Sequence, residues 1–249
     1  MNSSNLNITR RKAFLGGACL FLPLPAFGHH SGALPISQVS FPLRGDIGSG
    51  SEATITNIRT QDQKLALTFD DGPHPTYTPL LLDVLASRKV RATFYVVGRA
   101  AEYSPLIIRR ILDEGHELGN HSWSHPNFTG WETSEILTEV DRTNEVLFKA
   151  SGVMPNTFRP PYGAFSFEQR FKLYQDRGLP TVLWSVDPED WKHPGQQAIT
   201  ECIVTEAQPG SIVLSHDIHF DTIRSVPGTI DALVELGFSF ATVSELAEL

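Results

Sequence analysis

The chain has 249 residues, of which 41% are hydrophobic and 19% are charged, and its formal net charge is −8. A single α/β barrel of roughly 200–250 residues would use nearly all of this length and would bury a full core. An acidic protein repels phosphate backbones, so we expect no nucleic-acid partner. The first expectation is therefore one catalytic domain that acts on something other than nucleic acid.

Residues 1–28 have the pattern of an export signal. Two arginines and a lysine at positions 10–12 precede an apolar stretch that is interrupted by glycines and prolines. The stretch is shorter than the ~20 residues of a spanning helix. The paired arginines resemble a twin-arginine signal, although Phe14 stands one position later than in the usual pattern. We predict a signal peptide over 1–28, a periplasmic or secreted location, and no stable membrane span in the mature chain.

Residues 29–63 are rich in Gly and Ser and lack a long periodic segment, so we interpret them as a linker or N-terminal extension. Residues 64–249 alternate short β-type runs with amphipathic helical stretches, a pattern that predicts a parallel sheet with helices packed outside it. The pattern predicts seven strands, one fewer than a regular barrel contains. They are 65–69, 92–97, 117–119, 157–158, 181–186, 211–215 and 238–241.

Two helices have readable ends. Ser104 is predicted to cap a helix that has Pro105 at its first position and ends before Gly115. A second helix should begin at Thr133 and stop before Gly152. Its positions 136, 137, 140, 144 and 147 share one mostly apolar face, which indicates packing against a core and not a binding site.

Reactive side chains follow five of the predicted strands. In a barrel of parallel strands these ends meet at one mouth, where catalytic groups converge. A purely structural protein does not need reactive side chains at the ends of five strands, so the pattern favours an active site. The residues are Asp70 and Asp71, His121 and His125, Arg159, Asp187 and Asp190, and His216.

The adjacent acids Asp70 and Asp71 leave a strand and meet a Gly-Pro turn. One interpretation is an ordinary turn that caps the next helix. The other is functional: two neighbouring carboxylates repel each other, and a nearby cation would relieve them. One acid would then be a ligand while the other acts as a base.

His121 and His125 stand four positions apart, a spacing at which two imidazoles can converge on one metal ion. Taken alone, they are equally well explained as surface histidines of a loop. Together with Asp71 they form a set of two nitrogens and one oxygen, which leaves a position open for water. That arrangement is typical of a hydrolytic metal site.

Arg159 precedes a Pro-Pro-Tyr-Gly turn, and its permanent charge suits the task of holding a carboxylate base ionised. A structural salt bridge is the alternative interpretation. The segment 187–191 contains an acid, Asp187 or Asp190, that could raise the pKa of a nearby histidine, and His216 ends a buried strand.

These segments, in this order, resemble the five motifs of the NodB-homology polysaccharide deacetylases, carbohydrate esterase family 4. This family comprises chitin, chito-oligosaccharide and peptidoglycan N-acetylglucosamine deacetylases, and the similarity runs from about Lys64 to the C-terminus. The resemblance implies an α/β fold, a distorted (β/α) barrel with about seven parallel strands. It also implies metal-dependent hydrolysis of the acetamide of N-acetylglucosamine units, with release of acetate.

The resemblance further assigns roles to single residues. Zn²⁺ is the expected cation, with Co²⁺ or Ni²⁺ as alternatives, and the expected partner is an acetylated polysaccharide or oligosaccharide. Arg91 is either a further member of the charge network or a solvated arginine, and His74, His193 and His219 are interpreted as surface or loop residues. The implied roles are Asp70 as base, Asp71, His121 and His125 as metal ligands, Arg159 as the residue that steadies the base, the Tyr162 backbone N–H as oxyanion donor, Asp190 as partner of the general acid His216, and Trp191 and Leu214 as walls around the acetyl methyl group.

Two alternatives remain open at this level. The same chemistry would serve an O-acetyl esterase acting on a polymer such as acetylxylan. A non-catalytic carbohydrate-binding barrel is the other alternative, and the presence of both Asp70 and His216 argues against it because binding alone needs neither an acid nor a base.

Overall fold

The computed structural model describes residues 54–248. The predicted signal peptide and residues 29–53 of the predicted extension lie outside this range. None of the helices within residues 54–248 combines the length and the apolar character that a membrane span requires.

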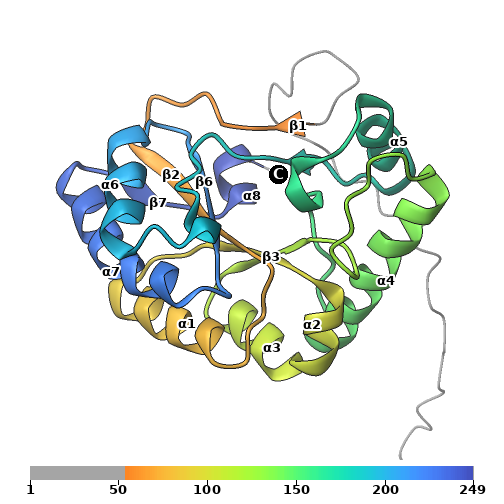
Figure 1. The fold of residues 1–249 in the computed structure, drawn as a ribbon, viewed down its shortest axis with the longest axis horizontal. Coiled ribbons are helices and arrows are strands. Elements are labelled where there is room, and N and C mark those ends of the chain that lie inside the picture. Colours follow the sequence, from red (N-terminus) through yellow and green to blue (C-terminus); the bar gives the residue numbers. More distant parts are fainter. Residues whose placement is uncertain (1–53, 249) are drawn as a thin grey trace, which may run out of the picture. The chain divides into compact units, whose positions relative to one another are not determined.

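Short parallel strands form the centre of the domain (Figure 1). β2 lies in the middle, with β3 and then β4 on one side and β6 on the other, while β7 pairs with the start of β2 and β1 pairs with β5. All of these pairings are parallel. The strands are β1 (Thr54–Ile55), β2 (Lys64–Asp70), β3 (Thr93–Val96), β4 (Glu117–Asn120), β5 (Thr181–Val182), β6 (Ile212–His216) and β7 (Ser239–Phe240).

Isolated bridges connect the two groups of strands. Phe158 bridges Asn120 of β4 and Thr181 of β5, and Val186 bridges Val213 of β6, in each case in parallel. The pairing thus follows a circuit from β6 through β2, β3 and β4 to the β5 region and back to β6. This irregular circuit fits the expected distorted barrel. The predicted strand at 157–158 is reduced to a single bridge.

The ordered pairing begins before Lys64, where the sequence places the domain boundary. Thr54 and Ile55 pair with β5, and the Ile58 N–H donates to the Gly210 carbonyl at 2.9 Å. Two-residue strands are too short to give a periodic signal, so the sequence pattern does not mark this segment.

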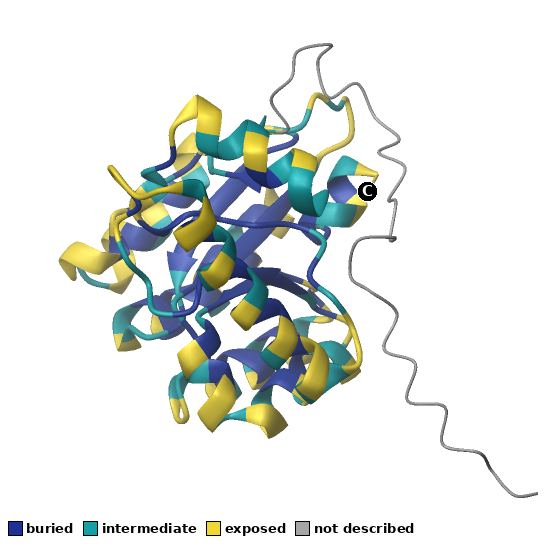
Figure 2. Ribbon diagram, turned by 90° about the vertical axis from the view of Figure 1, so that its right-hand side faces the viewer, coloured by how far each residue is buried: buried dark blue, intermediate teal, exposed yellow. Residues whose placement is uncertain are grey.

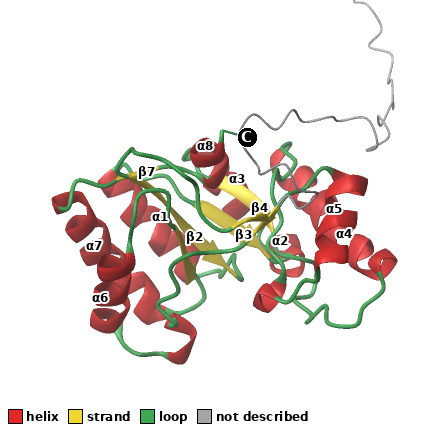
Figure 3. Cartoon of the chain, turned by 90° about the horizontal axis from the view of Figure 1, so that it is seen from above, coloured by secondary structure: helices red, strands yellow, loops and turns green. Residues whose placement is uncertain are grey.

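Helices surround the strands (Figures 1 and 3). α6 and α7 lie together at one side and α4 and α5 at the other, with α1, α2 and α3 along a third. The helices are α1 (Tyr77–Arg88), α2 (Gly98–Tyr103), α3 (Pro105–Asp113), α4 (Thr133–Ser151), α5 (Phe167–Arg177), α6 (Gln196–Glu206), α7 (Phe220–Glu235) and α8 (Val243–Ala247), with short 3-10 turns at η2 (Pro161–Gly163) and η3 (Asp190–Lys192).

The predicted helix ends are largely confirmed. α4 begins at Thr133 and ends before Gly152, whose φ of 77° suits a glycine after a helix. α3 begins at Pro105, but the Ser104 side chain makes no capping hydrogen bond, so that detail of the prediction is wrong. Pro105 itself lacks an N–H, which leaves one fewer donor for a cap to satisfy.

The alternation of side chains along β2 determines which of them point into the barrel. Leu65, Leu67 and Phe69 pack in the large apolar cluster, whereas Ala66 belongs to a second cluster. Because successive side chains point to opposite faces, Thr68 and Asp70 share the face of Ala66. Figure 2 shows the strands buried beneath helices whose outer faces are exposed. The pleat of one strand therefore carries Asp70 into the protein interior.

Candidate active site

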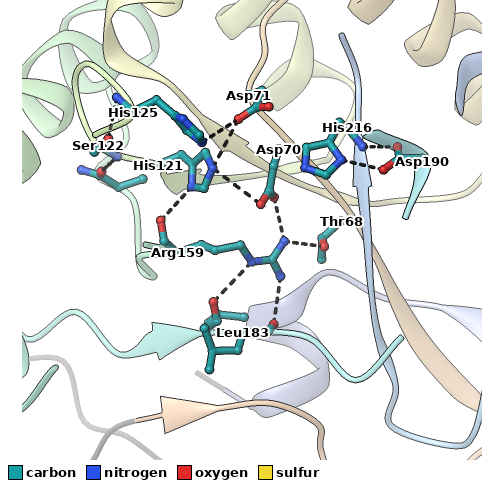
Figure 4. Close-up of polar contacts among 12 residues, drawn as sticks. Thr68, Asp70, Asp71, His121, Ser122, His125, Arg159, Leu183, Asp190 and His216 are labelled. Atoms are coloured by element: carbon teal, nitrogen blue, oxygen red, sulfur yellow. Dashed lines mark hydrogen bonds and ion pairs between the residues drawn. The ribbon is translucent and has the colours of Figure 1, made fainter. Parts of the chain in front are cut away.

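Asp70 is a buried carboxylate at the end of β2, and a fully buried guanidinium holds it in place (Figure 4). Arg159 donates from Nη1 to Asp70 Oδ1 at 2.7 Å. A charge-assisted hydrogen bond of this length stabilises the ionised form of the acid. Asp70 is thus held as a carboxylate with its second oxygen, Oδ2, free of the arginine.

Arg159 is fixed by contacts on several sides. Nη1 also donates to the Thr68 hydroxyl at 2.7 Å, and Nη2 donates to the Leu183 carbonyl at 3.1 Å. The guanidinium carbon lies 4.0 Å from the centre of the Tyr95 ring, a cation–π distance. A buried cation must be paired and hydrogen-bonded on all sides. The planar fork of an arginine meets this requirement, and a lysine would not.

Asp71, His121 and His125 converge beside Asp70. Their candidate ligand atoms all lie within 4.8 Å of one another. The Nε2 atoms of His121 and His125 are 3.4 and 3.1 Å from Asp71 Oδ1. Two imidazole nitrogens and one carboxylate oxygen with an open side are the donor set of a hydrolytic metal site.

The hydrogen bonding of this cluster fits a bound cation. His121 Nδ1 lies 2.7 Å from the Arg159 carbonyl, so Nδ1 carries a hydrogen, and in the neutral imidazole Nε2 presents a lone pair. Asp71 Oδ1 is buried without a hydrogen-bond partner among the described residues. A lone pair that faces an orphaned carboxylate oxygen is unfavourable unless a cation lies between them. The residues present therefore suit a divalent metal ion.

Asp71 is predisposed to be anionic. Burial alone would raise the pKa of its carboxyl group, but the neighbouring His121 and His125 outweigh burial and lower the pKa. An ionised carboxylate is the form that binds a cation.

The loop that carries the two histidines is strained and tightly held. Ser122 and His125 both have φ in the left-handed region, at 65° and 59°. Glu139 on α4 accepts the backbone N–H groups of Trp123 and Ser124 at 3.0 and 2.8 Å. Left-handed backbone at residues other than glycine costs energy and persists only where the surroundings enforce it. α4 thus supplies the constraint that aims both imidazoles at Asp71.

His216 and Asp190 form a second pair across the site. His216 Nδ1 lies 2.6 Å from Asp190 Oδ1, and Asp190 Oδ2 accepts from the His216 backbone N–H and the Thr222 hydroxyl. Burial lowers the pKa of the imidazole, but the hydrogen bond and charge of Asp190 outweigh this and raise the pKa of His216 to about 9. The imidazole is therefore protonated at neutral pH.

The remaining predicted residues lie on segments that adjoin these groups. Tyr162 is 66% exposed, has φ 60°, and lies edge-on against His125 with ring centres 4.7 Å apart. Within residues 54–248 we find no backbone acceptor for its N–H. Trp191 lies in η3 and is about half exposed, while buried Leu214 shares the inner face of β6 with His216.

The other residues considered from the sequence fall outside the cluster. Arg91 precedes β3, at the end of the barrel opposite the site, and pairs with Glu245 of the C-terminal helix. It is not part of the charge network. His74 Nδ1 accepts two backbone N–H groups in the turn before α1. His193 packs edge-on against His219 at 4.7 Å, and His219 is 5.8 Å from His216.

Asp217 is a further buried acid at the site, and it was not predicted from the sequence. Its side chain is fully buried, accepts a hydrogen bond from the Thr78 hydroxyl, and has one oxygen without a partner. Burial, together with the nearby carboxylates, raises the pKa of Asp217 to about 7. Its backbone N–H donates to the Asp70 carbonyl at 3.3 Å. The acid thus lies directly behind the turn that carries Asp70 and Asp71. The signal in the sequence that could have identified Asp217 is its position directly after His216.

A sequence model described as polysaccharide deacetylase matches residues 57–181 of the chain. The chain belongs to the polysaccharide deacetylase family. It is 34% identical over 209 residues to a chitooligosaccharide deacetylase from Rhizobium leguminosarum bv. trifolii, a match that covers 78% of this chain and 97% of the relative.

Two further relatives support this family assignment. The peptidoglycan-N-acetylglucosamine deacetylase PgdA of Listeria monocytogenes is 40% identical over 185 residues, which cover 74% of this chain and 39% of PgdA. The chain thus aligns with about two fifths of that protein. The solved structure of the peptidoglycan deacetylase PdaC from Bacillus subtilis superimposes with a TM-score of 0.71 at 39% identity, covering 76% of this chain and 91% of PdaC.

Proposed function

We propose that this chain hydrolyses the acetamide of N-acetylglucosamine units in a polysaccharide or oligosaccharide and releases acetate. One observation carries the proposal: Asp70 and His216 are register partners on the adjacent parallel strands β2 and β6. Neighbouring strands lie roughly 4.8 Å apart. A carboxylate and a protonated imidazole therefore lie on either side of the place where we propose that the acetamide binds. The metal-binding set lies beside them.

The two residues have complementary tasks. Asp70, held ionised by Arg159, accepts a proton from water as the water attacks the acetamide carbon. His216, held protonated by Asp190, donates a proton to the departing amine. Amide cleavage needs this second transfer because an unprotonated amine is a poor leaving group. The ionised Asp70 and the protonated His216, on two neighbouring strands, therefore supply the proton acceptor and the proton donor of the reaction.

Asp71, His121 and His125 are the proposed metal ligands, and Zn²⁺ is the proposed ion. When bound, such an ion supplies Lewis-acid polarisation of the carbonyl and lowers the pKa of water. The Arg159 carbonyl keeps His121 in the tautomer that presents Nε2.

The backbone N–H of Tyr162 is the proposed donor to the oxyanion. The left-handed conformation of this residue turns the peptide of η2, and the N–H lacks a backbone acceptor among the described residues. Preorganised donors of this kind are worth about 3 kcal/mol of transition-state stabilisation. Leu214 and Trp191 are proposed to enclose the acetyl methyl group.

The names of the relatives point to cell-wall and chitin-type substrates. PgdA is named a peptidoglycan-N-acetylglucosamine deacetylase, and the Rhizobium relative is named a chitooligosaccharide deacetylase. Both substrates contain N-acetylglucosamine, which is the unit we assign. We also propose that the chain is exported through residues 1–28, because paired arginines and a following apolar stretch there have the pattern of an export signal.

The test is acetate release from purified protein. N-acetylated chito-oligosaccharides, peptidoglycan fragments and acetylxylan would be incubated with the metal-loaded and the chelated protein, and the products resolved by mass. We expect metal-dependent loss of acetyl groups from the amide substrates. Release from acetylxylan alone would favour the O-acetyl esterase, and activity that survives full metal removal would contradict the proposed metal role.

A further inference from the structure

A row of residues crosses the sheet at the level of the proposed proton transfers. Strand register connects each member to the next, and register partners on parallel strands point to the same face of the sheet. From β6 through β2 and β3 to β4, the members of the row are His216, Asp70, Tyr95 and Gly119. The first two carry out the proposed proton transfers, whereas the last two have no task in those steps.

Tyr95 offers the face of its ring to the arginine that holds Asp70. The guanidinium carbon of Arg159 lies over the Tyr95 ring, 4.0 Å from its centre. The ring of Trp184 is farther away, with its centre 5.8 Å from the same carbon. Arg159 and Tyr95 are both fully buried. A cation–π contact is strongest where water is excluded, so the nearer ring should hold this cation firmly.

The contact joins a cation to a neutral ring. Burial is the main cause that raises the pKa of Tyr95, so the phenol keeps its proton. The Thr157 hydroxyl donates to the Tyr95 hydroxyl at 3.2 Å and holds the polar end of the side chain. Because the aromatic face and not the hydroxyl meets the arginine, a phenylalanine should do the same task at this position.

Gly119 leaves the space that this ring occupies. A Cβ on Gly119 would overlap Cδ1 and Cε1 of Tyr95. The backbone of Gly119 does not have the positive φ that favours glycine. A side chain at this position would therefore disturb packing against Tyr95 and not the conformation of the backbone.

The ring adds a restraint that the hydrogen bonds of Arg159 lack. Nη1 donates to Asp70 Oδ1 and to the Thr68 hydroxyl, both at 2.7 Å (Figure 4). The N–H groups of a guanidinium lie in its plane, so these bonds fix its position along that plane. A ring stacked on the face limits movement out of the plane. A catalytic group that moves by about 1 Å can lose much of its rate, so this restraint matters for Asp70.

We propose that Tyr95 is a positioning residue for the reaction, whose ring face fixes the plane of the Arg159 guanidinium and thereby the direction of the Asp70 carboxylate. Gly119 makes room for the ring. The proposal rests on the proposed function, because it takes Asp70 to be the base. Since Tyr95 acts through Arg159, loss of the ring should lower kcat and leave KM and bound metal unchanged.

The first experiment measures kcat, KM and metal content for Tyr95→Leu, Tyr95→Phe and Phe94→Leu on an N-acetylglucosamine oligomer. We expect kcat of Tyr95→Leu to fall about tenfold, with KM changed less than twofold, and Tyr95→Phe to restore kcat. Phe94→Leu is the matched control, because it removes an equally buried ring from the opposite face of β3. Its kcat should stay within twofold of the wild type despite a similar loss of stability. Equal values of kcat in Tyr95→Leu and Phe94→Leu would overturn the proposal.

Gly119→Ala provides a second variant that moves the ring without removing it. We expect kcat to fall here as well. Gly119→Ala combined with Tyr95→Leu should have the kcat of Tyr95→Leu alone, because no ring remains to be displaced. A further loss of kcat in the double variant would show that Gly119 does not act through the ring and would contradict its assigned part.

Crystal structures of the wild type and Tyr95→Leu test the positioning without turnover. We expect the Arg159 guanidinium to tilt in the variant and the contact between Nη1 and Asp70 Oδ1 to lengthen. An Arg159–Asp70 pair that keeps its geometry in Tyr95→Leu would overturn the proposal. A displaced pair, in a protein whose metal-loaded wild type releases no acetate, would support the positioning by Tyr95 and reject the proposed function.

Discussion

His216 Nδ1 and Asp190 Oδ1 lie 2.6 Å apart, and Asp190 is fully buried beneath the imidazole. Its second oxygen is occupied by the His216 backbone N–H at 2.8 Å and by the Thr222 hydroxyl at 2.6 Å. Each of these bonds favours the ionised carboxylate, so the pKa of Asp190 is lowered although burial opposes this. The pair therefore behaves as an ion pair in which the histidine keeps its proton.

This pair predicts an alkaline limit for turnover. Because Asp190 raises the pKa of His216 to about 9, the proton that the leaving amine needs is present up to that pH. We expect kcat to fall as the pH rises through about 9 in the wild type. Without the charge of Asp190, burial lowers the pKa of His216, so Asp190→Asn should move the alkaline limb to lower pH. Acetate release measured from pH 6 to 10 would show this, and an unchanged limb in Asp190→Asn would contradict it.

The same pair predicts how stability depends on pH. The pKa of His216 is higher in the folded protein, about 9, than its ordinary value of 6.5. The contribution of His216 to the free energy of unfolding is therefore complete below pH 6.5 and is lost as the pH rises through 9. The difference between the two pKa values corresponds to about 3 kcal/mol. Urea unfolding of the metal-free protein at pH 6 and 9.5 should show this loss in the wild type and a smaller loss in Asp190→Asn. Equal losses in the two proteins would reject the coupling.

Replacement of the three convergent donors should separate metal binding from folding. Asp71→Ala, His121→Ala and His125→Ala are each expected to lower the bound metal, because each removes one of three ligands. His193→Ala removes an exposed histidine outside the cluster and should retain full occupancy. Metal content by mass spectrometry after dialysis is the measurement. Full occupancy in all three variants would place the metal elsewhere.

Gly72 tests the packing behind the catalytic turn. A Cβ at this position would lie 2.3 Å from both carboxyl oxygens of buried Asp217. We expect Gly72→Ala to destabilise the protein by about 1–3 kcal/mol, as overpacking of a core does, and to lower kcat by displacing Asp70 and Asp71.

The matched control is Gly228→Ala. Gly228 is an exposed helical residue of α7 with open space around it, so the alanine should stabilise the helix by about 0.5–1 kcal/mol. Thermal unfolding of both variants gives the comparison. Equal melting temperatures for Gly72→Ala and the wild type would show that Asp217 does not confine the turn.

Long-range features of the site were accessible from the sequence because they depend on strand ends. Asp70 and His216 are the last residues of two buried strands. Parallel strands bring their carboxyl ends together independently of the loop conformations. A run of apolar residues followed by a charged one is visible without coordinates. The predictions for β2, β3, β4 and β6 were confirmed for the same reason.

Features that depend on loops and short segments were not accessible. β1 consists of two residues and pairs with β5, and no periodicity reveals so short a strand. Asp217 follows His216 directly, but its burial against Gly72 depends on how two loops pack. The Arg159 carbonyl that orients His121 is a backbone group and leaves no mark in the sequence.

The measurement that tests the central claim most directly is acetate release by the wild type and by Asp70→Asn, with bound metal determined on the same samples. We predict that the wild type releases acetate from N-acetylglucosamine oligomers. The variant should keep its metal and lose roughly 100- to 10,000-fold in kcat, the usual contribution of a general base. No acetate from the metal-loaded wild type, or near-normal turnover in Asp70→Asn, would contradict the account.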